Sequence, residues 1–239
     1  MTTDGPRGTR PRRRDRPLLP RGGSGTAGRA PAVAERPEAY PSGYEHAVVL
    51  ADGRPVFLRP VVPDDVTELA AAVRHADRET IRRRFLGAAG PRTEQELRHL
   101  VEVDYDHRFA VVAFDEAGTG IGIARYEGAT TWPAVELAVV VDRGWRHVGL
   151  ATALLCDVLH RAVEQGAHTA EADYFTDNVP VAHLLRDLEL PQRFRTAYGV
   201  VEDEVQLDGL QVPASRVPAQ RRLSGRPPTE GEQRGATGP

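Results

Sequence analysis

Residues 139–155 hold the pattern with the clearest chemical meaning: an apolar run, a short polar loop and the small residues that open a helix. The first backbone N–H groups of a helix have no partner within it, and the helix dipole adds positive charge there. Gly149 lacks a Cβ atom, so an anion can approach the backbone closely, and Arg146 places a positive charge beside it. The pattern therefore predicts a concave site for a phosphate or pyrophosphate group.

Glu136 is the only charged residue in the apolar run at residues 134–141, a few residues before this loop. We expect its apolar neighbours to desolvate the carboxylate and to raise its pKa toward neutrality, where a general base is most effective. A purely structural glutamate at an edge of the strand is the alternative interpretation.

Other chemistries have weaker support. The chain has no Gly-Lys-Ser/Thr sequence of a nucleotide P-loop, and no Gly-x-Gly-x-x-Gly motif follows its first predicted strand. Asp104 and Asp106 lack a third ligand at suitable spacing, so no metal site is predicted. Cys156, the single cysteine, falls in a helical pattern, where we expect a buried and inert thiol.

The composition predicts one domain between two tails. The formal net charge is −3, from 31 basic and 34 acidic residues, and all of the 31 are arginine. Residues 1–42 and 213–239 are rich in Pro, Gly and Arg without apolar periodicity, which predicts disordered tails around a domain at residues 43–212. No aromatic residue lies between the arginines of the first tail, so nucleic-acid binding is not expected. No membrane-spanning stretch or targeting peptide is recognised, which predicts a cytoplasmic protein.

Apolar periodicity locates the elements that must position this site. Strands are predicted at residues 54–60, 108–114, 120–127, 134–141, 168–174, 193–198 and 200–207. Helices are predicted from residue 63 to about 73, at 78–86, from 93 to 101, at 149–165 and at 179–188. Thr93 and Glu96 have the spacing of a capping box, and Gly166 is expected to end the long helix.

This order of elements predicts an α+β fold built on a mixed sheet. The turn residues 115–118 imply an antiparallel hairpin, to which the run at residues 134–141 adds a third antiparallel strand. Because this run is nearly continuous in apolar residues, we expect a central strand that is covered on both faces.

The hexapeptide from Arg146 to Ala151 matches the pattern Arg/Gln-x-x-Gly-x-Gly/Ala. With the strand before it and the helix after it, it resembles the acyl-CoA pyrophosphate loop of the GNAT superfamily of N-acetyltransferases. The resemblance extends over residues 54–208 and implies the GNAT fold, a centrally splayed β-sheet flanked by helices. Residues 82–114, with Arg84-Phe85-Leu86 and Val103-Asp104-Tyr105-Asp106, are similar to the bacterial protein lysine acetyltransferases of the Pat type.

The resemblance implies a set of site residues for acetyl-CoA, with no metal. Glu136 matches the general base of Pat-type enzymes. Asn178 fits a second cofactor position at the start of a helix, which it could also cap. Leu185 replaces a tyrosine that protonates the leaving thiolate in many relatives, so Tyr174 or His183 serves, or the thiolate leaves unassisted. The implied cofactor-binding residues are Val139, Val140, Val141, Arg146, His147, Val148, Gly149, Leu150, Ala151, Thr152 and Asn178.

The function implied is transfer of an acetyl group from acetyl-CoA to an amine, with a protein lysine as the expected acceptor. A small amine is the alternative acceptor, and acidic residues lining the acceptor groove would favour it. The non-enzymatic alternative is a GNAT-like module that binds acyl-CoA as a sensor. The presence of Glu136 favours an enzyme over the sensor, whereas the absence of the tyrosine that Leu185 replaces favours the sensor.

Overall fold

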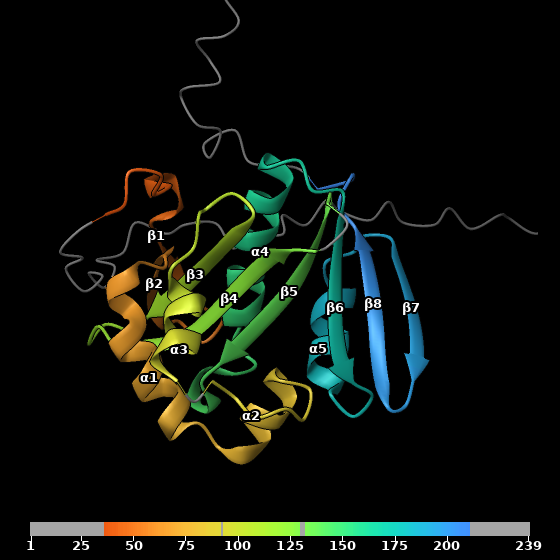
Figure 1. The fold of residues 1–239 in the computed structure, drawn as a ribbon, viewed down its shortest axis with the longest axis horizontal. Helices are drawn as coiled ribbons and strands as arrows, with labels where there is room; N and C mark the ends of the chain where they lie inside the picture. The colour runs from red at the N-terminus through yellow and green to blue at the C-terminus, as the bar shows by residue number, and fades with distance from the viewer. Residues whose placement is uncertain (1–35, 92, 130–131, 211–239) are drawn as a thin grey trace, which may run out of the picture.

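An eight-stranded sheet forms the frame of the protein, in the order β1-β2-β3-β4-β5-β6-β8-β7 (Figure 1). The computed structural model describes residues 36–91, 93–129 and 132–210. Neighbouring strands are antiparallel except for β5 and β6, which are parallel. The strands are β1 (His46–Val49), β2 (Pro55–Pro60), β3 (Arg108–Phe114), β4 (Gly120–Gly128), β5 (Ala134–Val141), β6 (Thr169–Phe175), β7 (Gln192–Ala197) and β8 (Val200–Gln206).

Helices cover the two faces of the sheet unequally (Figure 1). The helices are α1 (Val66–His75), α2 (Arg78–Arg84), α3 (Glu94–Val101), α4 (Leu150–Glu164) and α5 (Val179–Arg186), with 3-10 turns η1 (Ser42–Tyr44), η2 (Pro63–Asp65) and η3 (Arg143–Trp145). Helices α1, α2 and α3 lie on the front face, which we define as the face toward the viewer, while α4 and α5 lie behind the sheet. In the part of the chain that the structure describes, no helix is both long and apolar enough to cross a membrane.

The main core lies between α4 and the back face of the sheet. The apolar side of α4, with Leu154, Val158 and Leu159, is completely buried against residues of β3, β4 and β5. Each such side chain contributes about 1.5–3 kcal/mol of hydrophobic stabilisation. This packing holds the start of α4 in a fixed position at the end of β5.

Most of the predicted helices and strands are confirmed, as is the α+β fold. Strands β3 and β5 have the predicted bounds, and β3, β4 and β5 are consecutive antiparallel neighbours. The capping box of α3 is present, since the Glu96 N–H donates to Thr93 Oγ1 at 3.2 Å and the Thr93 N–H donates to Glu96 Oε2 at 2.8 Å. Strand β1 was not predicted, because it has four residues of which only one is buried.

Two expectations are corrected. β5 is not covered on both faces, since only Ala134, Val135 and Val141 are buried in it. The boundary at residue 43 is also too late, because Tyr40 is buried and packs edge-on against Tyr105, with ring centroids 5.8 Å apart. The remainder of the two predicted tails, residues 1–35 and 213–239, lies outside the described residues.

A buried ion pair fixes the start of α1 on β2. The Arg59 guanidinium donates to Asp65 Oδ2 at 2.8 Å and to Oδ1 at 2.7 Å. Asp65 Oδ2 also accepts the Val62 N–H at 2.8 Å, and the guanidinium lies 4.5 Å from the centroid of the Phe114 ring. Both side chains are almost inaccessible, so loss of one partner leaves the other charge buried and uncompensated.

We therefore expect Asp65→Asn to lower the free energy of unfolding by about 3 kcal/mol or more, measured by urea denaturation. Asp64→Asn is the matched control, because Asp64 is the exposed neighbour in the same turn. Its effect should stay within about 0.5 kcal/mol. Equal effects of the two substitutions would contradict the role given to the buried pair.

Candidate active site

The ladder between β5 and β6 stops early and opens a cleft. It contains the pairs Ala134–Thr169, Val135–Ala170 and Glu136–Glu171, after which the two strands diverge (Figure 1). A cleft of about 1160 Å³ begins here and reaches the start of α4. Backbone N–H and C=O groups that face the cleft have lost their partner strand and need another partner.

Most of the predicted site residues lie together along this cleft. Val148 and Leu150 do not line it: Leu150 is buried in the core, and the Val148 carbonyl accepts the Ala51 N–H at 3.0 Å. These two residues can offer only their backbone to a ligand. The predicted residues that line the cleft are Glu136, Val139, Val140, Val141, Arg146, His147, Gly149, Ala151, Thr152 and Asn178.

The loop before α4 has the backbone geometry of an anion site. His147 has a φ of 63° and Gly149 a φ of 90°, so the chain turns twice through the left-handed region before the helix begins. Gly149 is the N-cap of α4 and has no side chain to occupy the N–H groups of the first turn. A Cβ atom at Gly149 would meet no other atom within 4 Å, so the space in front of the helix is open.

Arg146 is held in place beside this loop. Its Nε donates to the Val141 carbonyl at 3.1 Å, and its Nη2 donates to Thr80 Oγ1 at 3.0 Å. These bonds tie the guanidinium to the end of β5 and to α2. The side chain is otherwise exposed, so it places a fixed positive charge at the mouth of the cleft.

Glu136 stands where the two strands separate, and it lines the cleft. The expected desolvation of its side chain is wrong: Glu136 is exposed, because the divergence of β6 removes the cover that a central strand would have. Its neighbours in the sheet are Glu127 on β4 and Glu171 on β6. A solvated carboxylate at this position can exchange protons with both a substrate and water.

Asn178 is placed at the start of α5, as predicted, but its side chain makes no capping hydrogen bond. Instead its Oδ1 accepts from Arg83 Nη1 at 3.4 Å, which connects α5 to α2 across the cleft. The residue is buried and lines the cleft.

Both candidates for protonating the leaving group line the cleft. The Tyr174 hydroxyl donates to Asp203 Oδ2 at 3.1 Å, and burial together with the Asp203 carboxylate raises the pKa of Tyr174 to about 12. Tyr174 therefore keeps its proton at neutral pH. His183 is exposed, and Leu185, at the position of the usual tyrosine, is buried.

Acidic side chains that the sequence analysis did not single out follow the cleft on β6. Burial and the Glu136 charge raise the pKa of Glu171, and burial and the Glu202 charge raise the pKa of Asp173. Glu204 and Glu202 on β8 are their partners in the ladder. Acidic residues alternate with other residues in both strands, and this spacing could have indicated that their side chains share one face of the sheet. Within residues 36–91, 93–129 and 132–210, no three His, Cys, Asp or Glu residues are grouped as a metal site.

Comparison with known proteins identifies relatives of this arrangement. A family model described as an acetyltransferase (GNAT) domain matches residues 56–190. The acetyltransferase Pat of Mycolicibacterium smegmatis is 30% identical over 179 residues, which are 74% of this chain and 52% of that protein. The chain thus spans about half the length of this curated relative.

Solved structures share the fold. The GNAT domain of S. lividans PAT superposes with a TM-score of 0.64 at 25% identity, covering 70% of this chain and 99% of that domain. A mutant of the cAMP-binding acyltransferase from Mycobacterium smegmatis gives a TM-score of 0.52 at 25% identity, covering 71% of this chain and 50% of that one.

The loop can be tested at Gly149, with Gly166 as its matched control. Both glycines have a positive φ, and at both a Cβ atom would meet open space. We expect either alanine substitution to cost about 1–2 kcal/mol of stability through backbone strain. Only Gly149→Ala should also weaken binding of coenzyme A, measured by calorimetry. If Gly149→Ala bound coenzyme A with unchanged affinity, the loop would not be part of the binding site.

The acidic neighbours of Glu136 predict a pH-dependent stability. The pKa of Glu171 is raised in the folded state, so the fold is favoured while Glu171 is protonated and loses that advantage as the pH rises through the raised pKa. Glu171→Gln should therefore raise the melting temperature at about pH 8 and lose this gain near pH 4. Glu38→Gln, at an exposed position, should show neither effect. A gain that is the same at both pH values would contradict charge repulsion as the cause.

Proposed function

The chain belongs to the acetyltransferase (GNAT) domain family, and from this membership we propose that it transfers an acetyl group from acetyl-CoA to an amine. The observation that carries the proposal is the cleft itself, lined both by the loop before α4 and by Glu136, where the ladder between β5 and β6 stops. The five steps along β5 from Glu136 to Val141 span about 16 Å at about 3.3 Å each, a length that an extended pantetheine arm bridges.

In this proposal the donor binds along the open edge of β5. The loop from Arg146 to Thr152 holds the pyrophosphate, and Asn178 contacts the donor from α5. Backbone N–H groups near Val139–Val141 face the pantetheine and the thioester carbonyl, where they stabilise the oxyanion that forms during attack. These groups are available because β6 has moved away from this part of the strand.

Glu136 acts as the general base. The acceptor ammonium loses a proton to the Glu136 carboxylate, the amine nitrogen attacks the thioester carbon, and the carbon–sulfur bond breaks as the amide forms. The thiolate is a good leaving group, and Tyr174, whose hydroxyl is held by Asp203 and which lines the cleft, supplies its proton.

The acceptor is a cationic amine, and we favour a protein lysine. Acidic side chains at Glu171 and Asp173 line the cleft, and those of β8 continue them over a part of the front face that no helix covers (Figure 1). An open acidic surface suits a lysine within a basic protein segment. The same acidic lining favours a small polycationic amine as the second candidate, because several charges of one molecule would be matched at once.

Glu136→Gln tests the assignment of the base. We expect kcat to fall by about 100-fold or more, while the Kd for acetyl-CoA stays nearly unchanged, because the amide keeps the shape but cannot accept the proton. Glu116→Gln, in the exposed turn between β3 and β4, is the control. The readout is acetyl-CoA consumption with a panel of lysine peptides, proteins and polyamines. Unchanged turnover would reject Glu136 as the base, and tight binding of acetyl-CoA without turnover on any acceptor would support a sensor.

A further inference from the structure

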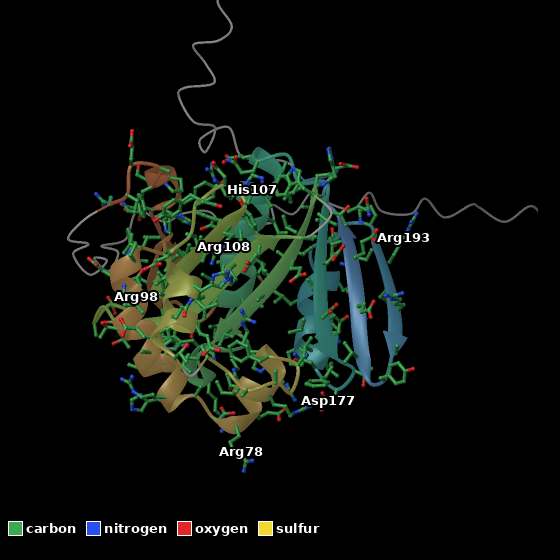
Figure 2. All side chains as sticks on the ribbon, viewed as in Figure 1. Arg78, Arg98, His107, Arg108, Asp177 and Arg193 are labelled. Carbon is green, nitrogen blue, oxygen red and sulfur yellow. The ribbon has the colours of Figure 1, made fainter. Side chains whose placement is uncertain are left out.

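A cationic cluster on the front face takes no part in the proposed mechanism. Arg125 Nη2 donates to Glu127 Oε2 at 2.6 Å, and Arg108 Nε lies 3.5 Å from Glu127 Oε1. The charges of Arg125 and Glu127 both influence the pKa of Arg84, which lies at the end of α2. One carboxylate thus stands among three guanidinium groups. Figure 2 shows Arg108 on the front face, where this cluster lies, while Arg78 projects away from the domain.

Donor groups in this cluster lack acceptors. Arg125 is 6% exposed, and in the described part of the chain its Nη1 is buried without a hydrogen-bond partner, as is Arg108 Nε. Burial and the Arg125 charge lower the pKa of Arg84 to about 10, so Arg84 remains charged at neutral pH. A buried charged donor without an acceptor is costly, and the cost falls when an anion supplies the missing acceptor.

A small side pocket connects this cluster to the cleft. Its volume is about 110 Å³, and its remaining walls are mostly apolar, with Leu69, Ile81 and Ile123 from three different elements. At about 30 Å³ for each water-sized group, it has room for roughly four such groups. The residues that line both the side pocket and the cleft are Thr80, Arg84, Phe85, Leu100, Arg125, Ala138 and Val140.

The connection between the side pocket and the cleft lies on β5. Ala138 is paired with Arg125, and Val140 with Ile123, and both residues line the cleft as well as the side pocket. A short chain that leaves the cleft at Ala138 would pass apolar walls and end at the guanidinium groups. Glu136 is two pairs further along the ladder, opposite Glu127, whose charge the arginines already compensate.

We propose that the side pocket binds a donor acyl group that ends in a carboxylate, so that the protein transfers succinyl-type groups as well as acetyl. This inference rests on the proposed function, which places the thioester carbonyl near Val139–Val141, where Ala138 and Val140 line both the cleft and the side pocket. The reaction balances as for acetyl transfer: the amide bond forms, the carbon–sulfur bond breaks, and the distal carboxylate is unchanged. A carboxylate of the acceptor has the same chemistry, but the pocket lies beneath α1, α2 and α3 with room for few atoms, which favours the acyl chain.

The experiment compares three donors with one amine acceptor. Succinyl-CoA and butyryl-CoA have chains of equal carbon number and differ in the terminal carboxylate, and acetyl-CoA reports the basic reaction. We expect Arg125→Gln and Arg84→Gln to lower kcat/KM for succinyl-CoA, relative to butyryl-CoA, by about 10- to 100-fold, the range of a charge-assisted hydrogen bond. Arg78→Gln, an exposed arginine of the same helix as Arg84, should leave this ratio unchanged.

Two further measurements separate the outcomes. Calorimetry measures binding of each thioester without turnover, and circular dichroism verifies that each variant is folded. A donor ratio that does not depend on Arg125 would overturn the inference while acetyl transfer stands. Tighter binding of succinyl-CoA that depends on Arg125, without transfer from any donor, would support the side pocket as the carboxylate site but would overturn both the transfer of succinyl groups and the proposed function.

Discussion

The early end of the parallel ladder between β5 and β6 is the constraint on which the site depends. A sheet normally pairs each strand along its length, and here the pairing stops at Glu136 and Glu171. The strands on either side remain in the sheet because β5 is held by β4 and β6 by β8 over most of their length. The divergence thus removes only the hydrogen bonds that would join β5 to β6 beyond this point. The backbone groups on these facing edges remain available to a ligand.

The two walls of the cleft carry opposite charge. Arginines are in excess on the side of α2 and β4, where Arg83, Arg84 and Arg125 line the cleft together with Glu79 and Glu127, and Arg146 is at its mouth. Carboxylates lie on the side of β6, with Glu171 and Asp173. An anionic donor and a cationic acceptor would therefore each have a wall of complementary charge, and the reacting atoms would meet between them.

Sequence reasoning located the elements but misjudged how β5 is covered. Apolar periodicity and turn residues report burial, and they were reliable where protein packs on protein, as in α4 and β3. The continuous apolar run of β5 was interpreted as burial beneath helices on both faces, whereas residues 137–140 face an open cleft. A strand that is covered by a ligand has the same pattern as one covered by helices, so composition alone cannot separate the two cases.

The same limit applies to the charged residues. Arg84 and Arg125 are far apart in the chain, and their shared carboxylate and side pocket become visible only when α2 packs over β4 and β5. Glu136 and the loop could be predicted as candidate site residues because each lies within one element or its boundary. Residues that meet through tertiary packing leave no local signal of this kind.

The two hydrogen bonds of Arg146 have a thermodynamic consequence for whatever anion the loop binds. A free arginine side chain loses up to about 2 kcal/mol of rotamer entropy when a ligand immobilises it. Arg146 has already lost much of that freedom, because hydrogen bonds to Val141 and Thr80 hold its guanidinium. Folding, and not binding, therefore carries this loss of entropy. The binding free energy then contains nearly the full attraction between the guanidinium and the anion.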